Sequence, residues 1–169
     1  SVAKYVATST LEAGLDVKSM SETSTKVFIL EVMGRHAGWI AAASALASTN
    51  ETDPPHIILM PEVSFVKKKF IDKVKQTVAN EGFCVVVASE GTRYKNGMFL
   101  ADSGLTDAFG HKQLGGVAPL LAQMISSIGL KNHWAVSDYL QRSARHISSK
   151  TDLDQAYAVG KKAVEFALS

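Results

Sequence analysis

The sequence contains a single cysteine and no long apolar run. Cys84 lies within the apolar run FCVVVAS and cannot form an internal disulfide, which fits a reducing compartment. No apolar run reaches the roughly 18 residues that a membrane-spanning helix requires. Residues 1–10 lack the basic and apolar regions of a signal peptide. We therefore expect a cytoplasmic protein. A helical pattern that begins at residue 2 also suggests that the chain is the middle of something longer.

A strong net charge is lacking as well. The 18 lysines and arginines nearly balance the 16 aspartates and glutamates, which leaves a formal charge of +2. This balance is not the basic footprint of a nucleic-acid-binding protein, so we expect neither nucleic acid nor a membrane as partner. The hydrophobic share of 46% is typical of a globular domain. A domain of this length buries roughly 70% of its unfolded surface, so it needs no disulfide or metal to fold.

The common catalytic signatures are also missing. The sequence has no GxxxxGK[ST] phosphate loop, no GxSxG nucleophile elbow and no pair of His, Cys or carboxylate residues at a metal-ligand spacing. A generic nucleotide-binding domain is therefore disfavoured, and we expect no metal ligands in this chain. Two glycines at 115–116 precede a helical pattern and could form an anion site there. We favour a simple turn that starts the helix.

Short apolar segments alternate with amphipathic ones along the chain. We predict strands over residues 26–33, 56–60, 83–89 and, as a weaker pattern, 133–140. We predict helices over residues 2–19, 39–48, 64–81, 117–128 and 151–168. Residues 91–112 form a long loop or a β-hairpin around Asn96-Gly97. The alternation predicts an α/β fold, a three-layer αβα domain with a mainly parallel sheet of about four strands, made by residues 1–169 as a single domain.

Charged side chains follow all four predicted strands, with Glu62 after the second. In open parallel sheets, ligands bind beyond the carboxyl ends of the strands, and Arg35, Glu90 and Arg142 stand there. An arginine fork matches phosphate, and a glutamate accepts hydrogen bonds from hydroxyls, so the set favours a phosphorylated sugar or a similar polyol phosphate. The alternative is a set of solvated loop charges, which follow strands in any α/β domain. Gly34 either lets a ligand approach the backbone or simply forms the turn.

Several segments, in order, resemble the phosphofructokinase family. EVMGRHAGW (31–39) resembles its MGR signature, and PEVSF (61–65) resembles the segment after the next strand. Glu90 falls at the family's substrate glutamate, and DYLQRS (138–143) resembles the segment that binds the sugar phosphate. SKTDLDQAYAVGKKAVEFA (149–167) resembles the helix that follows. The resemblance covers nearly the whole chain.

The resemblance implies phosphoryl transfer to the 1-hydroxyl of fructose 6-phosphate, which gives fructose 1,6-bisphosphate in glycolysis. Within the family, the chain resembles the pyrophosphate-dependent branch at Trp39, at Tyr139 and in the extra segment 91–112. ATP is the alternative donor, because some ATP-using members share MGRHAGW. The family's GGDG-type loop and its TIDND-type segment with the catalytic base do not occur here. The resemblance therefore implies a sugar-phosphate-binding domain without its phosphoryl-donor domain, inactive alone, with Mg2+ bound mainly by the missing part. A non-catalytic regulatory subunit is the other alternative.

The resemblance also assigns roles to residues at the strand ends. It implies that Arg35 is catalytic and stabilises charge on the transferred phosphoryl group, which is the main device of such enzymes. Glu90 would accept hydrogen bonds from sugar hydroxyls, and Arg142 would hold the 6-phosphate by its fork. The remaining substrate-binding residues implied are Met33, Gly34, Tyr139, Leu140 and Gln141.

Two positions depart from the family's pattern. Lys26 stands where the family has an arginine that reaches a neighbouring subunit's phosphate site, and lysine keeps the charge but loses the fork. His133 replaces a second family arginine, for which Lys131 could substitute. Because the family assembles its active sites across subunits, the resemblance implies a homo-oligomer, a dimer or larger.

Overall fold

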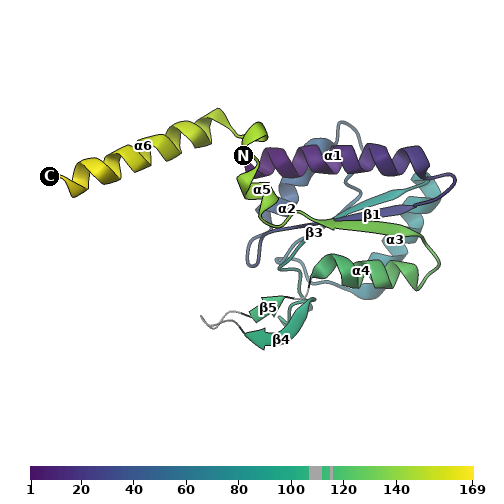
Figure 1. Cartoon of the computed structure of the whole chain (residues 1–169). Helices are drawn as coiled ribbons and strands as arrows, with labels where there is room; N and C mark the ends of the chain where they lie inside the picture. Colours follow the sequence, from purple (N-terminus) through teal and green to yellow (C-terminus); the bar gives the residue numbers. More distant parts are fainter. Residues whose placement is uncertain (107–111, 115) are drawn as a thin grey trace.

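The computed structural model describes residues 1–106, 112–114 and 116–169. Its main body has three layers, a sheet with helices on both faces (Figure 1). The helices are α1 (Val2–Met20), α2 (Trp39–Ala43), α3 (Lys67–Glu81), α4 (Val117–Ser126), α5 (Leu140–Ser143) and α6 (Lys150–Ala167), with short 3-10 turns at Ser44–Ala47 and Arg145–Ile147. The strands are β1 (Val27–Val32), β2 (Ile57–Leu59), β3 (Cys84–Ser89), β4 (Asp102–Thr106), β5 (Lys112–Leu114) and β6 (Asn132–Val136).

The central sheet has four parallel strands in the order β2-β3-β1-β6, which confirms the predicted fold class. The inner strands β1 and β3 consist largely of buried apolar residues, as expected of strands covered on both faces. Val32 at the end of β1 lies opposite Ser89 of β3, and Glu31 lies opposite Val136 of β6. The register therefore places the carboxyl ends of these three strands side by side.

Each face of the sheet packs against its own helices. On one face α1 and α2 cover Leu30, Val32 and Val87, and on the other α3 and α4 cover Ile29 and Val86. Neighbouring residues of one strand thus contribute to opposite cores, because successive side chains of a strand point to opposite faces. This packing holds the strand ends in fixed relative positions.

The fourth strand is shorter than predicted. Residues 133–140 were expected to be extended, but β6 ends at Val136 and the chain turns into α5. Asp138 interrupts the strand because it adopts a left-handed conformation, with φ of 39°. The backbone amide of Ser143 then donates to the Tyr139 carbonyl at 3.1 Å. Tyr139 to Arg142 therefore lie on a turn and a short helix.

The segment 91–112 contains two hairpin-like features. Gly97 N donates to the Tyr94 carbonyl at 2.9 Å, and Arg93 pairs with Phe99 in an isolated bridge, so of the two alternatives the structure has a short hairpin around Asn96-Gly97. The antiparallel ribbon of β4 and β5 follows, which the sequence did not predict. Residues 107–111 of the segment lie outside the described residues.

Helix α6 extends away from the body of the domain, as Figure 1 shows in yellow. All of its residues are exposed, and so its apolar face is not packed against the sheet. Its start is tied to the N-terminus: Ser149 N donates to Ser1 Oγ at 3.0 Å, and the terminal amine pairs with Asp152. Within the described ranges, none of the helices is both long and apolar enough to span a bilayer.

Candidate functional site

A cavity of about 180 Å³ opens at the carboxyl ends of β1, β3 and β6. Segments far apart in the sequence supply its walls. Its lining residues are Glu31, Val32, Met33, Arg35, Glu90, Val136, Asp138, Tyr139 and Gln141. The structure thus brings together five predicted site residues at the edge where an open parallel sheet binds its ligands. These five are Met33, Arg35, Glu90, Tyr139 and Gln141.

The turn after β1 is held by the end of β3. Gly34 N donates to Glu90 Oε1 at 3.3 Å, and Ser89 Oγ donates to the Gly34 carbonyl. Gly34 has a φ of 135°, and a Cβ there would lie 2.6 Å from the Ala37 carbonyl oxygen. The turn itself therefore requires this glycine. A carboxylate has about four acceptor positions, so Glu90 keeps capacity for ligand hydroxyls.

Gln141 is enclosed in the wall of the cavity, with 1% of its surface exposed. Its Oε1 accepts from Met33 N at 3.2 Å, and its Nε2 donates to the Asp138 carbonyl at 2.7 Å. Both ends of this amide are therefore engaged with backbone. The geometry fits a residue that positions the site, while direct contact with a ligand stays a prediction.

Tyr139 and Arg142 stack on each other at the mouth of the site. The Arg142 guanidinium carbon lies 4.2 Å from the centroid of the Tyr139 ring, a cation–π geometry. Tyr139 lines the cavity and is 59% exposed. Arg142 does not line it, and it forms no ion pair with any described residue. Its fork is therefore available to an anion at this edge.

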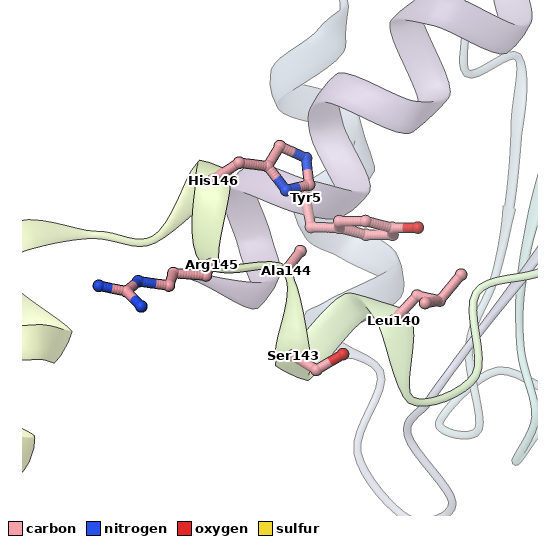
Figure 2. Close-up of a pocket in the computed structure, with 6 residues that line it drawn as sticks. All are labelled: Tyr5, Leu140, Ser143, Ala144, Arg145 and His146. Atoms are coloured by element: carbon pink, nitrogen blue, oxygen red, sulfur yellow. The ribbon is translucent and has the colours of Figure 1, made fainter.

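Leu140 faces a different hollow. This hollow measures about 740 Å³ and lies between the start of α1 and the turn after α5, as Figure 2 shows. Tyr5 of α1 and Ser143, Ala144, Arg145 and His146 line it with Leu140. Leu140 does not line the cavity that holds Arg35 and Glu90, so its predicted sugar contact is the one that the geometry supports least.

The three candidate phosphate contacts outside the cavity lie toward the amino ends of β1 and β6. Lys26 precedes β1 and its Nζ donates to the Ser21 carbonyl, while Lys131 Nζ donates to Ser24 Oγ at 2.8 Å. His133 is exposed on β6, beside Phe28 near the start of β1. At about 3.3 Å per residue, Lys26 and Lys131 lie about 17 Å along the strands from the lining residues Glu31 and Val136, and His133 lies about 10 Å from Val136. The cavity lies at the other ends of these strands.

Glu31 forms part of the cavity floor, which the sequence did not reveal. It is 5% exposed, and its Oε2 accepts from Ala118 N at 2.7 Å at the start of α4. Burial raises the pKa of Glu31; the amides of Ala118 and Val117 oppose that rise, and the charges of Glu90 and Asp138 add to it. The carboxylate of Glu31 therefore occupies the helix start where residues 115–116 could have formed an anion site.

The sequence pattern gave no role to three further residues, Ser89, Asp138 and Arg93. Arg93 follows Glu90 by three positions and contacts the turn after β1. The roles of Ser89 and Arg93 depend on contacts with the distant turn after β1, and Asp138 lies within DYLQRS without a sign of its left-handed backbone. Across residues 1–106, 112–114 and 116–169, no three His, Cys, Asp or Glu side chains are grouped so that they could hold a metal ion.

Comparison with known proteins finds relatives that carry the same name. The pyrophosphate–fructose 6-phosphate 1-phosphotransferase of Halomonas elongata is 67% identical over 169 residues, 99% of this chain and 40% of that protein. The protein of the same name from Methylococcus capsulatus is 57% identical over the same shares. The chain thus spans about 40% of the length of these curated relatives.

A solved structure and a family match agree with these relatives. The crystal structure of a pyrophosphate-dependent phosphofructokinase from Marinobacter aquaeolei is 60% identical, with a TM-score of 0.81 over 99% of this chain and 38% of that one. The family described as Phosphofructokinase matches residues 6–167. The order of its signature segments, the parallel sheet and the cavity at the strand ends agree with that match, and the chain belongs to the phosphofructokinase family.

Proposed function

We propose that this chain supplies the fructose 6-phosphate site of a pyrophosphate-dependent 6-phosphofructokinase. The reaction transfers a phosphoryl group from pyrophosphate to the 1-hydroxyl of the sugar and gives fructose 1,6-bisphosphate. The observation that carries the proposal is the gathering of Arg35, Glu90 and Tyr139 around one cavity, with Arg142 stacked on Tyr139 beside it. The relatives from Halomonas elongata and Methylococcus capsulatus, which are named for this reaction, are 67% and 57% identical to the chain.

The chemistry of each side chain suits a part of this reaction. Glu90 accepts hydrogen bonds from sugar hydroxyls, and the Arg142 fork binds the 6-phosphate beside the Tyr139 hydroxyl. Arg35 neutralises the charge that develops on the transferred phosphoryl group in the transition state. Phosphoryl transfer requires little covalent chemistry from the protein, so fixed positive charge and alignment supply most of the acceleration.

The phosphoryl donor and Mg2+ belong, in this proposal, to residues outside the chain. The relatives are about two and a half times as long, and the described residues gather no metal-ligand group. Mg2+ would supply charge neutralisation on the donor phosphates. ATP remains the alternative donor, because the ATP-dependent 6-phosphofructokinase 2 of Clostridium perfringens is 33% identical over 149 residues.

Intact site residues favour an enzyme over a non-catalytic subunit. A sugar-binding regulatory module needs a phosphate contact, but it has no physical need for Arg35, Glu90 and Arg142 together.

We propose, in addition, a homo-oligomer. Lys26, Lys131 and His133 lie toward the amino ends of the strands, away from the cavity at the carboxyl ends, so we expect any phosphate they bind to belong to a neighbouring subunit's site.

Titration of fructose 6-phosphate against the chain tests the sugar site. We expect saturable binding to the chain, with fructose as the ligand control for the phosphate. Arg142→Ala removes a charge-assisted hydrogen bond and should weaken binding about 10- to 100-fold. Arg145→Ala is the matched control, since this arginine lines the other hollow, and should leave the affinity unchanged. Absence of binding, or equal loss in both variants, contradicts the proposal.

Turnover by the longer protein that contains this chain tests the donor. In the presence of Mg2+, we expect fructose 6-phosphate to be consumed with pyrophosphate and not with ATP. Turnover with ATP alone would contradict pyrophosphate as the donor, and binding without turnover with either donor would favour the regulatory alternative.

A further inference from the structure

Arg93 connects the turn after β3 to the turn after β1. Its Nη2 donates to the Arg35 carbonyl at 3.0 Å and lies 3.3 Å from His36 Nδ1. Its Nε reaches the Gly91 carbonyl at 3.5 Å. The same guanidinium therefore contacts the backbone of the residue whose side chain is placed in the cavity.

Arg93 is itself held in place by Phe99. The guanidinium carbon lies 4.8 Å from the centroid of the Phe99 ring, and the backbones of the two residues pair in the isolated bridge. Stacking on an aromatic face leaves the edges of the guanidinium free to donate in its plane. The Arg93 guanidinium is therefore held on one face by Phe99 and bonded at its edge to the Arg35 carbonyl. This leaves it little freedom to move, so it restrains the position of Arg35.

Gly91 supplies a second constraint on the same carbonyl. A Cβ at Gly91 would lie 2.1 Å from the Arg35 carbonyl oxygen and 2.5 Å from that of Gly34. The peptide after Arg35 is therefore seated directly on the backbone of the turn that follows β3. Arg93 bonds this peptide from the side, so its plane is determined by two contacts.

Glu62 holds the far end of the same turn. Its Oε1 accepts from Gly38 N at 2.7 Å. That bond lowers the pKa of Glu62, and the positive charge of Arg93 adds to the effect. The positive charge of Arg93 thus lies near the middle of the turn of residues 33–38, and the negative charge of Glu62 lies at its end.

We infer that Arg93 is a positioning residue for Arg35. It fixes the Arg35 carbonyl and, through the peptide plane, the direction in which the Arg35 side chain leaves the backbone toward the cavity. The inference rests on the proposed function, because the role of Arg35 in phosphoryl transfer comes from it. A lysine at this position would keep the charge but lose the planar stack and the second donor.

Kinetics of the longer protein test the inference. We expect Arg93→Met to lower kcat about 10- to 100-fold, since small misplacements of a catalytic group have effects of this size. The affinity for fructose 6-phosphate should stay within about threefold, and Arg93→Lys should recover part of the rate. Lys95→Met is the matched control, because it removes the same charge from an exposed position of the same turn.

A double-mutant cycle separates positioning from general stability. If Arg93 acts through Arg35, then Arg93→Met should change kcat by less than about twofold in an Arg35→Ala background. Losses that multiply in the double variant would overturn the inference, and so would a normal kcat in Arg93→Met. If Arg35→Ala keeps the full rate, the proposed role of Arg35 fails, and the inference fails with it.

Hydrogen exchange of the chain provides a readout that does not depend on activity. We expect Arg93→Met to accelerate amide exchange in residues 34–38 by about tenfold, with the strands unchanged. Unchanged exchange in this turn overturns the positioning role even where the protein proves to be a phosphofructokinase in every other assay. Accelerated exchange in an inactive protein would instead show that the proposed function alone has failed.

Discussion

Gln141 Oε1 accepts a hydrogen bond from the Met33 backbone amide at 3.2 Å, across 108 positions of sequence. The same side chain donates to the Asp138 carbonyl at 2.7 Å. One buried amide therefore joins the turn after β1 to the turn after β6. The relative position of these two turns determines where Arg35 stands with respect to Tyr139, since both line the cavity.

Removal of the Gln141 amide should destabilise the domain and distort its site. Gln141→Leu leaves the Met33 amide and the Asp138 carbonyl without this partner, and the loss of two hydrogen bonds at about 0.5–1.5 kcal/mol each sums to about 1–3 kcal/mol. We expect urea unfolding to show a loss of this size, together with weaker binding of fructose 6-phosphate. Gln76→Leu at an exposed position of α3 is the control. A free energy of unfolding equal to that of the parent would contradict the role of the Gln141 amide in joining the two turns.

Asp138 should tolerate only residues that accept a left-handed backbone. Its φ of 39° is costly for most side chains and least so for Gly, Asn and Asp. We expect Asp138→Asn and Asp138→Gly to unfold close to the parent, and Asp138→Val to lose about 1–2 kcal/mol. Thermal unfolding measures the series. Equal melting temperatures for the valine and glycine variants would contradict a left-handed requirement.

The central sheet could be predicted because its strands carry local signals. FCVVVAS reads as a buried strand by itself, and the edge where Glu90 lies follows from the rule for parallel sheets. Arg93 and Glu31 carry no such signal. Glu31 interrupts an apolar strand, and its burial becomes acceptable only when the amides of α4 meet it. The left-handed backbone at Asp138 is a local feature, since its carbonyl accepts from Gln141 only three positions away, but no turn glycine marks it in the sequence.

Helix α6 shows a second limit of local patterns. Its apolar spacing predicts a packed face, yet Leu153, Tyr157 and Phe166 are all exposed. Periodicity indicates that a helix has an apolar face and does not indicate which surface will cover it. Sequence reasoning therefore identified the helix correctly without its packing.

Deletion of residues 150–169 should have little effect on the stability of the sheet domain. Because every residue of α6 is exposed, its removal uncovers no core, and the melting temperature should fall by less than about 2 °C, a shift of under 1 kcal/mol. Loss of the exposed apolar side chains should also reduce self-association, measured by light scattering. A fall of more than about 5 °C would mean that α6 packs on the domain in solution.

Glu31 should give the stability of the domain a specific pH dependence. Its folded pKa is raised above the ordinary value of 4.5, so the folded state holds the proton more tightly than the unfolded chain. The stabilisation that comes from this proton is present below about pH 4.5 and is lost as the pH rises through the folded pKa. At neutral pH, the buried charge therefore opposes folding, and the Ala118 amide offsets part of its cost.

Two substitutions separate the charge of Glu31 from its hydrogen bond. Glu31→Gln keeps an acceptor for Ala118 N, so at pH 7 it should be at least as stable as the parent, and its advantage should shrink toward pH 4.5. Glu31→Leu leaves that buried amide without an acceptor and should lose about 1–3 kcal/mol near pH 4.5, and this loss should shrink toward pH 7, where the parent carries a buried charge. Urea unfolding between pH 4.5 and 7 measures both, with the exposed Glu12→Gln as control. Parallel pH profiles for the parent and Glu31→Gln would show that the folded pKa of Glu31 is not raised.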